Sequence, residues 1–409
     1  MDSDSRLNYI GLLRQHRGLL AISFLAVFTG NLGQSFFIGL FQSDISAELN
    51  ISAGEFGSIY SAITLFSGFL VMHFGPKIDW IAPKQYALAI LAALLLGLIL
   101  LTLSPWWLVG MLGLALVRIC GQGLMTHFGN TLAAREFVVN RGRALGINAL
   151  AMPCGEIILP PITALLLLWL TWQQVWWVII IALVLLWSSL YLLVDWPSAP
   201  HKHAAAAKKA NGKSPIRERT FWMLIPMLLV IPSTLTGIFV YQAQLTTDLG
   251  ASSTTYILAL TAMGLIRFPV ALIGGGWIDD LGVTRIARLY LVPYALALLI
   301  SASIGSDIGI WVLMIGAGIS MSMSSGVADS LLVDLWGRER LGRVRSLRSA
   351  LLVFSTGIAP ALFGLLIDLE FQFQTLLYGM LVFLITAALL AQSPIRKAQR
   401  LSIKHKSTS

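Results

Sequence analysis

Long apolar runs occupy most of this chain, and the basic residues are confined to short segments between them. Stretches of about 20 apolar residues recur along all 409 positions, and only 11% of the residues are charged. A run of this length crosses the roughly 30 Å hydrocarbon core of a bilayer as an α-helix. The sequence therefore predicts an all-α membrane protein with twelve transmembrane helices. These spans are expected near residues 19–42, 54–76, 86–104, 106–130, 144–168, 173–195, 221–243, 255–278, 286–304, 308–332, 347–368 and 373–391.

The basic residues also predict the orientation of the spans. Twenty-six of the 28 Lys and Arg residues lie in seven clusters, which precede the first span or follow the even-numbered spans. Loops on the opposite side contain Asp and Glu but no Lys or Arg. Because cytoplasmic loops carry the excess of Lys and Arg, both termini are expected in the cytoplasm, in a multi-pass protein of a bacterial inner membrane. This topology accounts for the net charge of +9, so no nucleic-acid partner is predicted.

The two halves of the chain match each other at an offset of 200 residues. Six spans per half predict parallel, pseudo-symmetric six-helix bundles with a binding site at their interface near the bilayer midplane. We expect an N-terminal bundle at 1–196, a cytoplasmic linker at 197–219, and a C-terminal bundle with a basic tail at 220–409. The matching pairs are Gln42 and Gln242, Gly75 and Gly275, Ile78 and Ile278, Asp79 and Asp279, Gly142 and Gly342, Arg143 and Arg343, and Pro160 and Pro360.

Two loops contain related glycine and aspartate motifs. Gly275-Gly276-Trp277-Ile278-Asp279, followed by Arg285, lies between spans eight and nine, and Gly75-Pro76-Lys77-Ile78-Asp79 lies between spans two and three. With the twelve spans and the duplicated halves, these loops resemble the major facilitator superfamily over nearly the whole chain. The resemblance implies the major facilitator fold, alternating access, and a latch that closes the cytoplasmic side. The alternative is that both loops only mark the ends of spans. The implied gating residues are Gly75, Asp79, Gly275, Asp279 and Arg285.

Four charged residues lie three or more residues away from either end of a predicted span, namely Arg118, Glu156, Arg267 and Asp329. An Arg at the bilayer centre costs about 2.5 to 3.5 kcal/mol on insertion scales, so each of the two Arg residues needs a partner or a water-filled cavity. Arg118 and Glu156 lie at similar depth in consecutive spans, and as a structural pair they would neutralise each other. The competing interpretation is a role in substrate binding or proton coupling. Glu156 is then the first candidate proton site and Asp329 the second.

Arg267 is the candidate anchor for a substrate. The residues one turn away are Met263 and Ala271, so its counter-charge must come from another element or from a bound anion. A guanidinium group matches a carboxylate bidentately. Gly264-x-x-Arg267 resembles the monocarboxylate and oxalate/formate transporter branch, in which an Arg on this span binds the substrate carboxylate. The alternative for Arg267 is structural pairing with Asp329 or with the backbone.

Span four contains a second family-like motif. Arg118-Ile119-Cys120-Gly121-Gln122-Gly123 resembles the superfamily pattern of Arg followed by Gln and Gly, with the Gln one place later than usual. In proton-driven members this Arg is linked to proton transfer. The resemblance therefore implies that Arg118 is either a coupling residue or a second cation for the substrate.

Neutral polar residues in spans one and seven complete the candidate site. Asn31 and Gln34 are expected on one helical face, and Tyr241 and Gln244 on another. They could line a binding site or hydrogen-bond neighbouring helices. The thiols of Cys120 and Cys154 lack the spacing of a metal site or a disulfide framework. No cofactor, metal or catalytic motif is predicted, so the chain is not expected to be an enzyme.

These observations favour a secondary active transporter that acts as a monomer and couples a small organic anion to protons. An exporter of drug-like compounds with the same fold is the first alternative, although the acid that such exporters usually carry in span one is missing here. A membrane receptor or sensor that binds a ligand without moving it is the alternative from another class.

Overall fold

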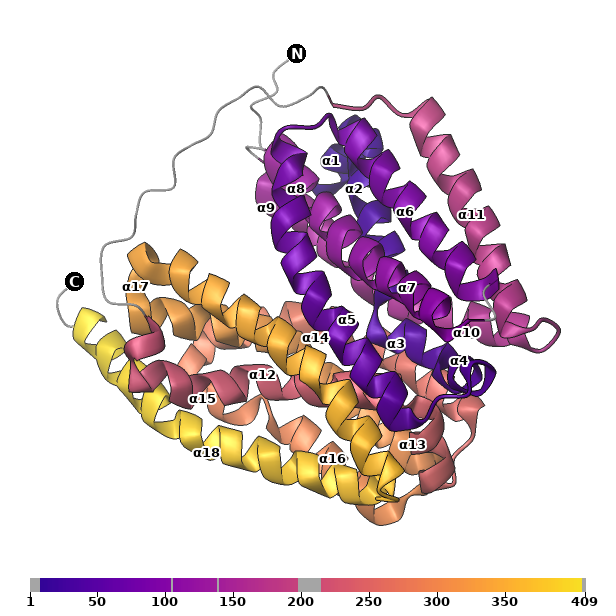
Figure 1. Ribbon diagram of the computed structural model, residues 1–409. Coiled ribbons are helices and arrows are strands. Elements are labelled where there is room, and N and C mark those ends of the chain that lie inside the picture. Colours follow the sequence, from indigo (N-terminus) through magenta and orange to yellow (C-terminus); the bar gives the residue numbers. More distant parts are fainter. Residues whose placement is uncertain (1–7, 104–105, 138–139, 198–214, 407–409) are drawn as a thin grey trace. The chain divides into compact units, whose positions relative to one another are not determined.

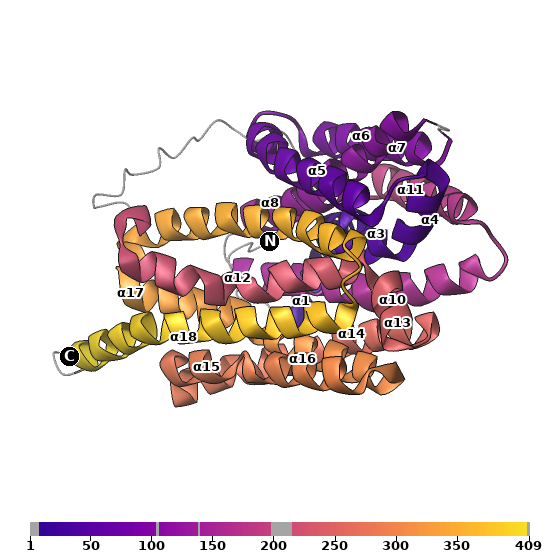
Figure 2. The same cartoon turned by 60° about the horizontal axis from the view of Figure 1, so that its bottom comes forward.

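The computed structural model describes residues 8–103, 106–137, 140–197 and 215–406, and in these segments the chain is helical apart from short connections (Figures 1 and 2). Eleven helices among the described residues are long and apolar enough to cross a membrane. A bent pair, Arg17–Gly33 and Ser35–Leu49, gives a twelfth span if it is counted as one. The predicted all-α membrane class with twelve spans is confirmed.

The described residues form two compact units. Unit 1 comprises those within 1–51 and 62–205, and unit 2 those within 52–61 and 206–409. The first turns of α5 (Ala53–Phe74) thus belong to unit 2, while the rest of this helix belongs to unit 1. Residues 198–214, most of the expected linker, lie outside the described residues. The boundaries at 196 and 219 stay a prediction.

Small residues let the helices of unit 1 approach closely. A side chain at Gly113 would collide with the backbone of α6 at Leu101, and one at Gly97 would collide with α7. Such close approach is how helices pack in a bilayer, where apolar side chains gain little by leaving lipid. The buried indole of Trp187 donates to Thr29 Oγ1 (3.1 Å) and ties α11 to α2. The elements of unit 1 are α1 (Tyr9–Gln15), α2 (Arg17–Gly30), η1 (Asn31–Gly33), α3 (Ser35–Ile38), η2 (Gly39–Phe41), α4 (Gln42–Leu49), the remainder of α5, η3 (Gly75–Asp79), α6 (Pro83–Leu103), α7 (Trp107–Val117), η4 (Arg118–Met125), α8 (Thr126–Glu136), α9 (Arg141–Ala149), α10 (Ala151–Leu167) and α11 (Trp172–Leu193).

Unit 2 packs its first long helix, α12, against both α17 and α18 (Figure 2). The buried Tyr294 fastens α16 to its neighbours, since its hydroxyl lies 2.9 Å from Thr234 Oγ1 and its backbone N–H donates to Ser320 Oγ. The helical run α17 contains two spans, which meet at Gly337 with φ 71°, a backbone angle that favours glycine. The elements of unit 2 are the start of α5, η5 (Pro215–Arg217), α12 (Arg219–Val240), α13 (Gln242–Leu249), α14 (Ser253–Leu281), α15 (Val283–Leu289), α16 (Val292–Ile304), α17 (Ser306–Asp368) and α18 (Phe373–Lys406).

The offset of 200 residues is visible in the helices themselves. The eight-residue helices α4 and α13 begin at Gln42 and Gln242 and end before residues with left-handed backbone, Asn50 and Gly250. A serine then caps the next long helix in each half, because the backbone N–H groups of Glu55 and Thr255 donate to the hydroxyls of Ser52 and Ser252. The matching sequence pairs therefore mark a structural repeat.

Candidate functional site

The first span is broken in its middle, at Gln34. The backbone of Gln34 is extended (φ −78°, ψ 151°), and the two helical segments on either side are bent by 48°. The expectation that Asn31 and Gln34 share one continuous helical face is wrong for this reason. Non-helical backbone at membrane depth is tolerated only where protein groups or water satisfy its polar atoms. The break therefore needs partners from another helix.

Arg118 on span four supplies the partner for this break. Its Nη1 donates to the carbonyl oxygen of Gly33 (2.8 Å) and reaches Ser35 Oγ at 3.5 Å, while Nη2 donates to Thr64 Oγ1 (2.9 Å). The side chain is only 2% exposed. A cation at the C-terminal end of a helix is favoured by the helix dipole, and this one also satisfies a carbonyl at the break.

Span four is itself irregular at the same place, because residues Arg118–Met125 form a π-helix. A side chain at Gly121 would come 2.9 Å from the backbone nitrogen of Gly33. The π-helix of span four and the break in span one therefore lie against each other. They can approach this closely only because glycine occupies position 121.

Asn31 and Glu156 are both buried in the same unit, with exposures of 1% each. The Asn31 amide donates to the carbonyls of Phe28 (3.0 Å) and Ala151 (3.1 Å), which ties η1 to α10. A side chain at Gly155 would collide with this amide, so Asn31 packs against the residue that precedes Glu156. The Oδ1 atom of Asn31 accepts no hydrogen bond from the described residues. The predicted pair between Arg118 and Glu156 stays a prediction.

In unit 2, Arg267 lies half-buried near the middle of α14. The helix packs tightly here against α17, since a side chain at Gly318 would come 2.7 Å from Ile266 Cγ2. Asp329, the second candidate proton site, pairs with Arg345 (2.9 Å) and lies 3.9 Å from Arg348. Its side chain is 45% exposed, which is more typical of an interfacial ion pair than of a buried proton carrier.

Tyr241 and Gln244, expected to line the substrate path, both have protein partners in unit 2. Tyr241 is 1% exposed, and its hydroxyl lies 2.8 Å from the carbonyl oxygen of Ala53 and 2.9 Å from that of Pro360. Gln244 Nε2 donates to Asp248 Oδ1 (2.7 Å). The roles of Tyr241 and Gln244 toward a substrate stay predictions.

A polar cluster around Asp368 was not singled out by sequence reasoning. Its Oδ2 accepts from Ser52 Oγ (2.7 Å) and from the backbone nitrogen of Gly54 (3.0 Å), and the nitrogen of Ala361 donates to Ser61 Oγ (2.9 Å). These bonds hold the first turns of α5 against the end of α17. The only sequence feature that could have pointed to this cluster is Asp368 itself, an acid beside a loop without basic residues.

Replacing Asp368 by alanine is expected to loosen residues 52–61 selectively. Two hydrogen bonds to a largely exposed carboxylate contribute together about 1 kcal/mol, so amide exchange in this segment should accelerate roughly fivefold. Hydrogen–deuterium exchange with peptide resolution measures this effect. Glu370→Ala, which removes a neighbouring exposed acid, is the control and should leave exchange unchanged. Equal exchange in the Asp368→Ala variant and the wild type would contradict the assignment.

The predicted gating residues are only partly described. Gly75 is buried against His127 and Asp79 is exposed, while Arg135 donates to the carbonyl of Ile78 (3.2 Å) and fastens this loop to α8. In the second copy Arg285 is exposed. The burial of Gly275 and the side chain of Asp279 lie outside what the structure describes. The latch stays a prediction.

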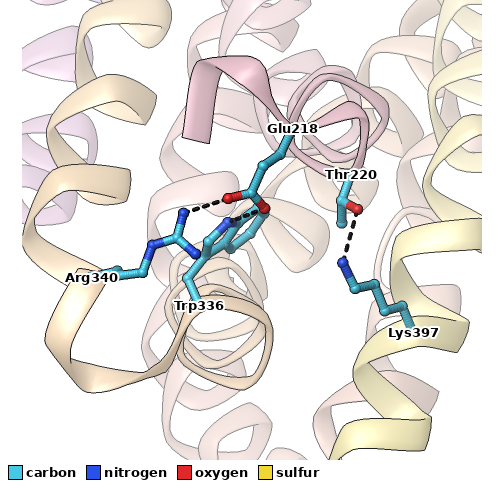
Figure 3. A network of polar contacts seen from close by, with 5 residues as sticks. All are labelled: Glu218, Thr220, Trp336, Arg340 and Lys397. Atoms are coloured by element: carbon cyan, nitrogen blue, oxygen red, sulfur yellow. Dashed lines mark hydrogen bonds and ion pairs between the residues drawn. The ribbon is translucent and has the colours of Figure 1, made fainter. Parts of the chain in front are cut away.

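A second polar network, also missed, surrounds the start of α12 (Figure 3). Glu218 accepts from the indole of Trp336 (2.9 Å) and pairs with Arg340, which lie on either side of the bend at Gly337. Lys397 on α18 reaches Thr220 Oγ1 at 3.2 Å. Together these bonds tie the end of the predicted linker to α17 and α18.

A sequence model described as the Major Facilitator Superfamily matches residues 23–245 and 227–406. The chain belongs to this superfamily. It is therefore a multi-pass membrane transporter and not an enzyme, and it acts on a small molecule from within a lipid bilayer. No curated protein sequence matches the chain.

Among solved structures, the superfamily fold of this chain is similar to that of a bacterial homologue of the human lysosomal transporter Spinster. The inward-facing, unoccupied form has a TM-score of 0.71 at 15% identity, covering 97% of this chain and 99% of the other. The inward-facing, occupied form has a TM-score of 0.67 at 13% identity, covering 96% and 97%. At such identities the likeness establishes the fold alone.

Proposed function

We propose that this major facilitator protein is a proton-coupled secondary active transporter for a small organic anion. The observation that carries the proposal is the half-buried guanidinium group of Arg267, near the middle of a membrane-spanning helix. Ionisable side chains at this depth are costly and usually mark the path of a substrate or an ion. We place the protein in a bacterial inner membrane, as a monomer with cytoplasmic termini.

The chemistry of Arg267 favours a carboxylate as its ligand. A guanidinium group stays charged in a dry environment and presents two parallel N–H donors, which match the two oxygens of a carboxylate. The resemblance of Gly264-x-x-Arg267 to the monocarboxylate and oxalate/formate branch supports the same substrate class. A small monocarboxylate is our preferred substrate.

Glu156 is the proposed proton site. It is 1% exposed, and it adjoins Gly155, against which the Asn31 amide packs. A protonated carboxyl group can donate a hydrogen bond, and a buried acceptor that has no other hydrogen bond is stabilised by receiving one. The Oδ1 atom of Asn31 is such an acceptor among the described residues. Protonation of Glu156 would then alter bonding close to the break in span one.

Counterflow in proteoliposomes tests the substrate class. Proteoliposomes that contain the purified protein are loaded with monocarboxylates, dicarboxylates, amino acids, phosphate or cationic drugs. Exchange with labelled substrate outside is then measured with and without a pH gradient. We expect exchange of a monocarboxylate and its accumulation when the outside is acidic. Transport of cationic drugs alone would favour an exporter, and binding without flux would favour a receptor.

Glu156→Gln is expected to uncouple transport while preserving exchange. The substitution keeps the shape of the side chain but removes its titratable proton, so accumulation driven by the pH gradient should fall. The amide of Gln can still donate a hydrogen bond but cannot gain or release a proton, so uptake should stop responding to the pH gradient while exchange continues. Glu136→Gln changes an acid that pairs with Arg135 at the end of α8, and it serves as control. Full accumulation by Glu156→Gln would overturn the assignment.

A further inference from the structure

A groove of about 220 Å³ is lined by residues of α6 and α11. These two helices lie side by side in unit 1 (Figure 1). One wall is formed by Ala87 and Leu91, the other by Trp187 and Tyr191. Each pair is four residues apart and therefore lies on one face of its helix. Leu88 and Leu192, also in the lining, are 48% and 80% exposed, so the groove opens to the outside of the helices. Exposed leucines of transmembrane helices contact acyl chains.

One end of the groove is basic and aromatic. Lys84 lies one turn before Ala87, and its Nζ sits 4.0 Å from the centroid of the Tyr191 ring. The Trp196 ring lies 5.9 Å from that of Tyr191, and its indole nitrogen donates to the carbonyl of Leu190. Tyr and Trp are enriched at the level of lipid headgroups. This end therefore lies at the membrane interface, on the side that the basic clusters predict to be cytoplasmic.

The charge around this end is mostly positive. A side chain at Gly18 would lie 2.7 Å from Val194, so the first turn of α2 packs against the end of α11 and brings the exposed Arg17 to the same level. Asp195 is the acid on this rim, and it is exposed. Basic pockets between helices on the cytoplasmic side are suited to anionic lipid headgroups.

We infer that this groove binds an anionic phospholipid, with the phosphate at Lys84, beside the aromatic end of the groove, and one acyl chain along the exposed Leu88, Ser188 and Leu192. The order of groups, from Lys84 beside the groove through the aromatic rings of Tyr191 and Trp196 to aliphatic side chains, follows the order of groups in such a lipid. Trp187 is only 3% exposed and its indole N–H is bonded to Thr29 inside the unit, so this wall of the groove presents no unpaired indole donor to the lipid. The site is formed by unit 1 alone and is independent of the substrate proposal.

Photo-cross-linking locates the lipid. The protein is placed in phosphatidylcholine vesicles that contain a phosphatidylglycerol with a diazirine in its acyl chain, and labelled peptides are identified by mass spectrometry. We expect labelling within 187–196 that excess phosphatidylglycerol suppresses and excess phosphatidylcholine does not. One Lys contributes about 1 kcal/mol to such binding, so Lys84→Gln should lower the labelling about fivefold.

Lys77 provides a matched control, because its Nζ also lies over an aromatic ring, 4.5 Å from the centroid of Phe74. Phe74 does not line the groove, whereas Tyr191, the ring under Lys84, does. Lys77→Gln should leave labelling of 187–196 unchanged. Ser188→Phe, which fills the groove from its exposed side, should suppress the labelling even though Lys84 is present. Equal suppression by both lipids, or an equal loss in the Lys77→Gln and Lys84→Gln variants, would overturn the inference.

Discussion

Arg267→Ala is expected to abolish transport of the organic anion while leaving the protein folded. The guanidinium group is the proposed bidentate partner of the substrate carboxylate, and truncating one side of such a charged pair costs about 2 to 5 kcal/mol. Substrate affinity should therefore fall by about 30-fold or more. The measurement is initial uptake and substrate binding in proteoliposomes, normalised to folded protein.

Two further variants separate charge from geometry. Arg267→Lys keeps the charge but presents it as a point, so transport should be partly retained with weakened selectivity for carboxylates. Arg217→Ala removes an exposed cation from the same unit and should transport normally. Uptake at the wild-type rate by Arg267→Ala would reject the anion proposal and favour the exporter. Loss of folding in Arg267→Ala would instead identify Arg267 as a structural residue.

Much of the fold follows from one-dimensional patterns. A run of about 20 apolar residues has few alternatives in a bilayer to a helix that satisfies its own backbone, and this is why twelve spans were predictable. The repeat could equally be predicted from the sequence, and α4 and α13 do begin at the matched Gln42 and Gln242. The sequence also identified Arg118, Glu156 and Arg267 as exceptional, because charge inside an apolar run is visible without coordinates.

The partners of those residues could not be predicted from the sequence in the same way. Hydrophobic periodicity predicts a continuous helix through Gln34, because the break changes backbone angles and not the apolar character of the run. Once the break is known, the carbonyl of Gly33 needs a donor, and Arg118 supplies it. Similarly, Asp368 lies 314 residues from Gly54, a pairing that depends on tertiary packing. Sequence indicates which residues are costly in a membrane, while packing decides what satisfies them.

Arg118→Ala is expected to destabilise unit 1 as well as to stop transport. Removing the side chain leaves the carbonyl of Gly33 and the hydroxyl of Thr64 without this donor in a buried environment. Each such loss costs about 1 to 3 kcal/mol, so the combined effect of about 2 to 6 kcal/mol should appear as a clear drop in the thermal unfolding temperature. Cys120→Ala, at a buried position of the same π-helix, should have a much smaller effect.

A double-mutant cycle distinguishes the hydrogen bonds of Arg118 from its charge. If the bond to Thr64 matters as the 2.9 Å contact indicates, Thr64→Ala should cost less in the Arg118→Ala background than in the wild type. Arg118→Lys keeps a cation near the broken helix end but cannot reach both acceptors, so it should recover part of the stability. If it recovers stability and not pH-driven uptake, the fork geometry of Arg118 serves transport. If Arg118→Ala unfolds at the wild-type temperature, the break at Gln34 does not depend on Arg118.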